Sequence, residues 1–137
     1  MMGNKPSTSS QASPTSYPME KWLYGAVVLG VLAGILHIYI GVVIFGIPQG
    51  IVLVLIALVY FVGAGLVAAN YKRDLWLRIA LGWVILVMVL WALSAAVNVA
   101  GTRDPLALLE KALEVILLVL LVRLRTVRMT ALKPVTK

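Results

Sequence analysis

The only histidine of this 137-residue chain, His37, lies inside a long apolar segment. Two glutamates, Glu110 and Glu114, lie in another apolar segment with Lys111 between them. Because residues four apart share one face of a helix, the two carboxylates are expected to point the same way. An imidazole and two carboxylates can accept protons, hydrogen-bond a ligand or bind a divalent cation. Ionisable side chains inside a membrane span are costly, so these residues form a candidate functional site.

The composition indicates a chain that is solvated by lipid. Hydrophobic residues make up 62% and charged residues 12%, and the mean hydropathy is +1.03. A soluble domain has roughly 25% charged residues. The chain has no cysteine, which excludes disulfides, thiol catalysis and thiolate metal sites. It also lacks the P-loop, dinucleotide-binding, HExxH and GxSxG motifs, so we expect a protein that is not an enzyme, identify no cofactor and assign no metal-binding residue.

Four apolar runs predict an all-α, polytopic membrane protein with a bundle of four transmembrane helices. Each run is close to the roughly 20 residues that cross a bilayer as a helix. The predicted spans, which together form a transmembrane domain over 19–123, are 22–45, 51–69, 75–100 and 105–122. Asp104 and Pro105 have the residue types of a helix N-cap and first position. The Ser/Thr/Pro-rich segment 1–18 predicts a disordered tail, and 124–137 predicts a basic tail.

The distribution of charge predicts the orientation. With four spans, all of the 12 Lys and Arg residues except Arg103 and Lys111 lie on the side that holds both termini. The positive-inside rule then places both termini in the cytoplasm and the chain in the cell membrane. The basic C-terminal tail is expected to contact anionic lipid headgroups. Nucleic acid is not expected as a partner, because the positive charge is spread over separate membrane-flanking segments.

The unusual polar residues gather at one depth. His37 lies about 22 Å along its helix from Trp22, in the outer half of the hydrocarbon layer. Glu110 and Glu114 lie about 6 and 12 Å from Leu106, in the same half. If the helices that carry them are adjacent, the candidate ligand-binding residues are His37, Tyr60, Ser94, Asn98, Glu110 and Glu114. A structural hydrogen bond of His37 across a helix interface is an open alternative to a ligand-binding role.

Small residues mark the helix face that includes His37. They follow at spacings of three and four residues, so they share a face of the helix. Gly30 and Gly34 form a GxxxG pattern, which lets another helix backbone approach closely. The residues predicted to pack against a neighbouring helix are Ala26, Gly30, Gly34 and Gly41.

Over residues 22–123 the chain resembles an uncharacterised archaeal family of four-helix integral membrane proteins. The resemblance is carried in order by HIYIGVVIFG, YFVGAGLV, YKRDLW, VLWAL and RDPLALLEKALEVILLVLLV. Its most distinctive positions are His37, Tyr39, Gly41, Asp104, Lys111 and Glu114. The resemblance implies the four-helix membrane architecture and brings no assigned activity.

Three functions are compatible with these observations. The first is a non-enzymatic protein that works by helix association, as a homo-oligomer or as an accessory subunit of a larger membrane complex. The second is a site for a small molecule, a quinone or a divalent cation, in the outer half of the bundle, centred on His37, Glu110 and Glu114. The third is an oligomeric channel or carrier, since four short helices are too few to enclose a transport path alone.

Overall fold

The computed structural model describes residues 19–46, 48, 50–99 and 101–131. These residues form helices and connecting turns, without a strand among them. The elements are α1 (Met19–Tyr39), a π-helical segment (Ile40–Phe45), α2 (Gly50–Ala68), α3 (Arg73–Ala96) and α4 (Pro105–Ala131). The predicted all-helical class is therefore confirmed. The predicted tail 1–18 lies outside the described residues, as does the end of the predicted tail 124–137.

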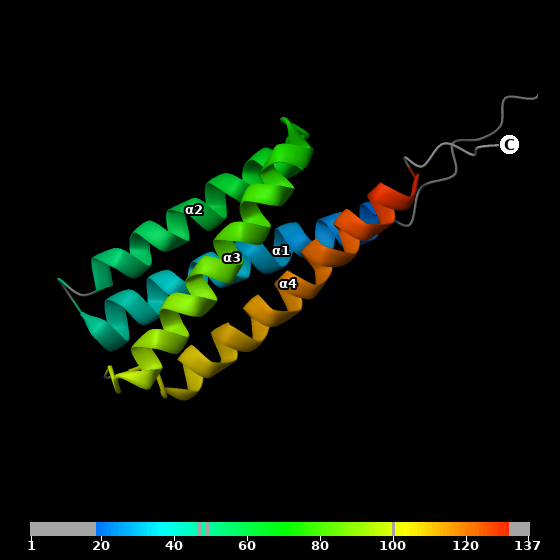
Figure 1. Cartoon of the computed structure of the whole chain (residues 1–137). Helices are drawn as coiled ribbons and strands as arrows, with labels where there is room; N and C mark the ends of the chain where they lie inside the picture. The colour runs from blue at the N-terminus through cyan, green and yellow to red at the C-terminus, as the bar shows by residue number, and fades with distance from the viewer. Residues whose placement is uncertain (1–18, 47, 49, 100, 132–137) are drawn as a thin grey trace, which may run out of the picture.

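Successive helices run in opposite directions. The α1–α2 and α3–α4 connections lie at one end of the bundle (Figure 1). The α2–α3 connection lies at the other end, together with the start of α1 and the end of α4. We call the first of these ends the hairpin end. An up-down-up-down bundle with short connections of this kind needs no long crossover.

Three of the helices are long and apolar enough to cross a membrane. They are α1 with its π-helical continuation (Glu20–Phe45), α2 and α3. Large apolar side chains cover their outward faces, among them Leu32, Leu55 and Leu86. This exterior fits a membrane protein, because lipid solvates apolar side chains that water would not. The helix α4 carries more charged residues than the other three.

The small-residue face of α1 packs inside the chain. Ala26, Gly30, Gly34 and Gly41 are all buried. A side chain at Gly41, in the π-helical segment that continues α1, would meet the backbone of Gly50 at the start of α2. The π-helical segment and α2 therefore approach each other closely at this point. Facing residues on α2 are Ala64 for Gly30, Phe61 for Gly34, and Gly50 and Leu53 for Gly41.

The ends of α3 and α4 differ from the predicted spans. The helix α3 ends at Ala96 rather than at residue 100, and Asn98 has a left-handed backbone with φ of 58°. Asparagine tolerates this conformation better than most residues, which allows a turn to follow the helix. The helix α4 runs to Ala131, whereas the predicted span ends at Val122. The prediction from hydropathy marks only the apolar part of the helix, whereas α4 continues beyond it into residues that include several arginines.

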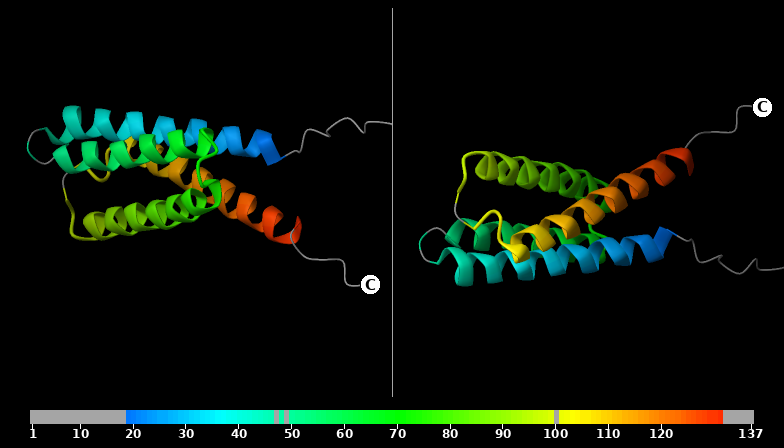
Figure 2. Two further views of the ribbon diagram at one scale, coloured as in Figure 1. Left: turned by 90° about the horizontal axis from the view of Figure 1, so that it is seen from above. Right: turned by 90° about the horizontal axis from the view of Figure 1, so that it is seen from below.

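The start of α4 is as predicted. The backbone N–H of Leu106 donates to Asp104 Oδ1 at 2.8 Å, so Asp104 caps the helix and Pro105 begins it. From this point α4 crosses the bundle at an inclination to the other helices, and its first half lies against α1 (Figure 2). The helix α3 packs less extensively, against α2 and α4. The cap therefore fixes the point at which the charged residues of α4 enter the bundle.

Candidate functional site

His37 is held by the helix that carries it. It lies in the last turn of α1, directly before the π-helical segment, and its side chain is 2% exposed. The ring Nδ1 lies 2.9 Å from the carbonyl oxygen of Ala33. Because a carbonyl can only accept, Nδ1 carries the hydrogen of this bond. In the neutral imidazole the other nitrogen, Nε2, is then an acceptor with a free lone pair.

The first turns of α4 carry three charged residues into the bundle. Glu110, Lys111 and Glu114 are all buried, and Glu114 has no exposed surface. Lys111 Nζ lies 2.8 Å from Glu110 Oε2 and 2.7 Å from Glu114 Oε2. One ammonium group thus bridges two carboxylates. Charge-assisted hydrogen bonds of this kind offset part of the cost of removing the charges from water.

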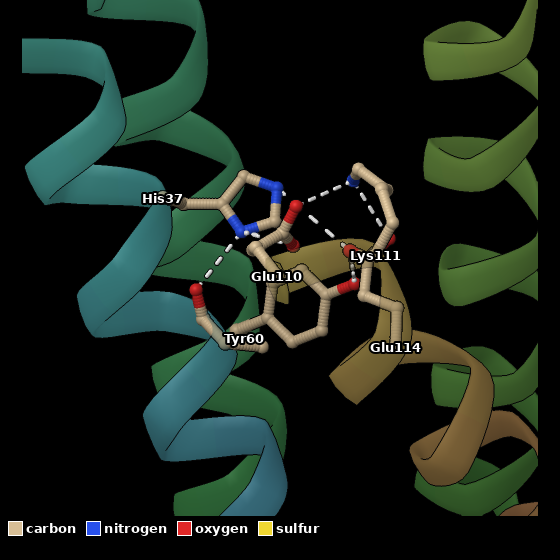
Figure 3. A network of polar contacts seen from close by, with 6 residues as sticks. His37, Tyr60, Glu110, Lys111 and Glu114 are labelled. Atoms are coloured by element: carbon tan, nitrogen blue, oxygen red, sulfur yellow. Dashed lines mark hydrogen bonds and ion pairs between the residues drawn. The ribbon is translucent and has the colours of Figure 1, made fainter. Parts of the chain in front are cut away.

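The second oxygen of each carboxylate faces α1 and α2. Tyr60 of α2 donates to Glu114 Oε1 at 2.5 Å. His37 Nδ1 lies 3.1 Å from Glu110 Oε1, and His37 Nε2 lies 3.8 Å from Glu114 Oε1. Glu110 Oε1 accepts no hydrogen bond. Figure 3 shows side chains from α1, α2 and α4 meeting at this point. We call His37, Tyr60, Glu110, Lys111 and Glu114 the polar cluster.

A cavity of about 380 Å³ lies beside the polar cluster. His37, Glu110 and Lys111 form its polar wall. Most of its remaining lining is apolar, and includes Ile40, Phe45, Val52, Leu53, Ile56 and Val87. Trp91 also lines the cavity, and its buried Nε1 has no hydrogen-bond partner. A space of this size with one polar wall has the character of a small-molecule site.

The structure brings four of the six predicted site residues together: His37, Tyr60, Glu110 and Glu114. Ser94 lies on the cavity wall, but its hydroxyl donates to the carbonyl of Leu90 rather than to the cluster. Asn98 does not belong to the site. It is exposed, lies beyond the end of α3 and accepts a hydrogen bond from Arg103. The prediction for Asn98 was wrong because it assumed that the helix continues to residue 100.

Two residues of the site are absent from the predicted set. Lys111 supplies the positive charge of the cluster, and Trp91 lines the cavity with a buried indole N–H that has no hydrogen-bond partner. The sequence holds a signal for Lys111, because it adjoins Glu110 and lies three residues before Glu114, within reach on one helix. No comparable signal marks Trp91, since tryptophans also serve as packing residues and membrane anchors.

The cluster has the residue types of a metal site as well. His37, Glu110 and Glu114 each offer one nitrogen or oxygen atom, and these atoms lie within 4.8 Å of one another. Two carboxylates and an imidazole suit zinc and several other divalent transition metals. The arrangement can therefore hold a proton, a hydrogen-bonding ligand or a cation.

Comparison with protein-family models, with curated proteins and with solved structures finds no match for this chain. The resemblance to the archaeal four-helix family stays a prediction that these comparisons do not test. The class that the fold itself defines is a helical protein with three helices able to span a membrane.

Proposed function

We propose that this chain is an integral protein of the cell membrane that crosses the bilayer four times. Support for the fourth crossing comes from the way α4 distributes its polar and apolar residues. Its charged residues in the first turns face inward and are paired with one another. Its outward residues over the same length are apolar: Leu108, Leu109, Val115, Ile116, Val119 and Val122. A helix that pairs its charges internally can present an apolar exterior to lipid.

The proposed orientation has both termini in the cytoplasm. Arg73 and Arg78 near the start of α3 and Arg123 and Arg125 in α4 favour it, because all four belong to the end of the bundle away from the hairpin end. Arg103 is the basic residue of the α3–α4 connection. Basic residues are concentrated at the end away from the hairpin end and are scarce at the hairpin end. This pattern is typical of a cytoplasmic face and an external face, respectively.

The chain has no cysteine, so single cysteines can report this topology. We expect a membrane-impermeant maleimide added to intact cells to label Arg103→Cys. It should label Tyr71→Cys, in the α2–α3 connection, and Ser10→Cys only after the membrane is permeabilised. External labelling of Ser10→Cys in sealed cells would contradict the orientation.

For function, we propose that the cavity binds a small amphiphilic molecule of the quinone class. The single observation that carries this proposal is the cavity of about 380 Å³ with apolar walls and one polar wall. A quinone has an apolar ring and two carbonyl acceptors. Lys111 uses two of its three N–H groups on the carboxylates, which leaves one N–H for a ligand. This N–H fits a carbonyl oxygen, whereas the apolar walls fit the ring and its tail.

Function by helix association is less favoured by the structure. The sequence argument for it used the small-residue stripe, and that stripe packs between α1 and α2 of the same chain. It is therefore not available as a surface for another chain. The cavity and its polar wall, by contrast, are features that a purely associating bundle does not need.

A variant that fills the cavity tests the proposal. Ala107 is buried on the cavity wall and takes no part in the polar cluster, so Ala107→Leu reduces the space without removing a donor. In nanodiscs we expect a short-chain ubiquinone analogue to quench the tryptophan fluorescence of the wild-type protein at low quinone-to-lipid ratios. Ala107→Leu should weaken this binding at least tenfold, which corresponds to about 1.4 kcal/mol.

The matched control is Ala112→Leu, on the outward face of the same helix. It makes the same chemical change outside the cavity and should bind the quinone analogue like the wild type. Equal binding by the wild type and Ala107→Leu would place the quinone elsewhere, or only in the lipid, and would refute the cavity as its site.

A further inference from the structure

We propose that His37, Glu110 and Glu114 bind one divalent transition-metal ion of the zinc class, through His37 Nε2 and one oxygen of each carboxylate. The three side chains come from α1 and α4, and one ring nitrogen of His37 and one oxygen of each carboxylate lie within 4.8 Å of one another. This metal site shares His37 and Glu110 with the polar wall of the cavity, but neither proposal requires the other.

The orientation of His37 is the first observation in favour of a metal ion. Its Nδ1 donates to the backbone carbonyl of Ala33, which leaves the Nε2 lone pair free. Metal-binding histidines are commonly fixed in this way, with one ring N–H on a backbone carbonyl or carboxylate and the other nitrogen on the metal. His37 Nε2 lies 3.8 Å from Glu114 Oε1. Two ligands of a tetrahedral zinc ion, each about 2.1 Å from it, are about 3.4 Å apart, so only a small movement is needed.

The second observation concerns Glu110. Its side chain is 3% exposed, and its Oε1 has no hydrogen-bond partner although it points toward His37. A buried carboxylate oxygen that accepts no hydrogen bond is unfavourable unless it binds a cation instead. The other oxygens, Oε2 of Glu110 and Oε2 of Glu114, are taken by Lys111. Glu114 Oε1 accepts from the Tyr60 hydroxyl. The metal ion would therefore bind the free Glu110 Oε1 and share Glu114 Oε1 with Tyr60, with the lysine ammonium on the Oε2 side.

The charges of the cluster also leave room for a cation. The single ammonium group of Lys111 lies between two acidic side chains, so the cluster holds one more acid than it has permanent cations. Lys111 and a divalent ion nevertheless repel each other through the shared carboxylates. Removing the lysine charge should therefore strengthen metal binding, provided that the metal binds the same two glutamates.

The experiment uses the full chain without a polyhistidine tag, purified in detergent and titrated with Co²⁺ and Zn²⁺. We expect one Co²⁺ per chain by elemental analysis, visible d–d absorption bands, and loss of those bands on addition of Zn²⁺. His37→Gln and Glu110→Gln should each weaken Co²⁺ binding at least tenfold, because each removes one ligand and keeps the side chain polar. Lys111→Met should bind Co²⁺ more tightly than the wild type.

Two controls separate this proposal from quinone binding and from misfolding. Ala107→Leu should bind Co²⁺ like the wild type, because it alters the cavity and none of the three ligands. Circular dichroism and gel filtration establish that each variant compared is folded. Failure of the wild type to bind stoichiometric Co²⁺, or unchanged binding by folded His37→Gln, would overturn the metal site while leaving the quinone proposal untouched.

Discussion

Replacement of Lys111 by methionine is expected to destabilise the metal-free protein more than any other conservative change in the bundle. Methionine matches the length of the lysine stem, so the change removes the ammonium group that lies 2.8 and 2.7 Å from two carboxylates. Both glutamates are then left buried without their cation. Breaking a buried ion pair by removing one partner costs about 3–5 kcal/mol. Equilibrium unfolding in mixed micelles with EDTA measures the difference.

A matched control removes a positive charge from an exposed position of the same helix, α4. Arg125→Met should change the free energy of unfolding by less than about 0.5 kcal/mol, because Arg125 is exposed. Replacing both glutamates by glutamine in the Lys111→Met background should recover most of the lost stability, since no charge then remains in the cluster. Equal stability of Lys111→Met and the wild type would mean that the lysine does not balance the carboxylates in the folded protein.

Much of the fold could be predicted because three of the apolar runs are long enough to cross a membrane as helices. A span must be helical to satisfy its own backbone groups, so the apolar runs directly indicate helices. The cap at Asp104 was also predictable, because its hydrogen bond is local. The helix ends were harder. The turn after Ala96 depends on the left-handed backbone of Asn98, and a hydropathy pattern carries no information on that angle.

The candidate site was predictable in part for a similar reason. Spacing places Glu110, Lys111 and Glu114 within reach of one another on one helix, and helical rise places His37 at a matching depth. Which helices are neighbours is not local information. The contact of α1 with α4 brings His37 to the acids, whereas α3 lies further off and leaves Ser94 across the cavity. The cavity and the unpaired Trp91 nitrogen follow from this packing of the helices, which no residue pattern in the sequence predicts.

The π-helical segment after His37 also has no sequence signature. It continues α1 through Ile40–Phe45 with a wider turn, and the apolar residues in it would suit an ordinary α-helix equally well. The buried Gly41 lies in this segment and meets the backbone of Gly50. A close approach of two backbones at this point constrains α1 and α2 directly beside His37. The glycine pattern predicts such an approach but not its effect on the helix.

Removal of one hydroxyl, in Tyr60→Phe, is expected to have the second-largest effect on stability. Tyr60 is 5% exposed, and its hydroxyl donates to Glu114 Oε1 at 2.5 Å. The change leaves the ring and its packing against His37, but one oxygen of a fully buried carboxylate loses its donor. Hydrogen bonds to charged groups contribute about 1.5–3 kcal/mol. Equilibrium unfolding of Tyr60→Phe should show a loss in this range.

The control for Tyr60 is Tyr39→Phe, at a position in α1 that is 48% exposed. Its loss should be under about 0.5 kcal/mol, because the Tyr39 hydroxyl has no hydrogen-bond partner among the described residues that the change could remove. A double-mutant cycle with Glu114→Gln then isolates the Tyr60–Glu114 term, for which we expect a coupling of about 1–3 kcal/mol. A coupling near zero would show that Tyr60 stabilises the bundle through its ring alone. A large coupling means that α2 fixes the acid of α4 through this one hydroxyl, and so positions it opposite His37.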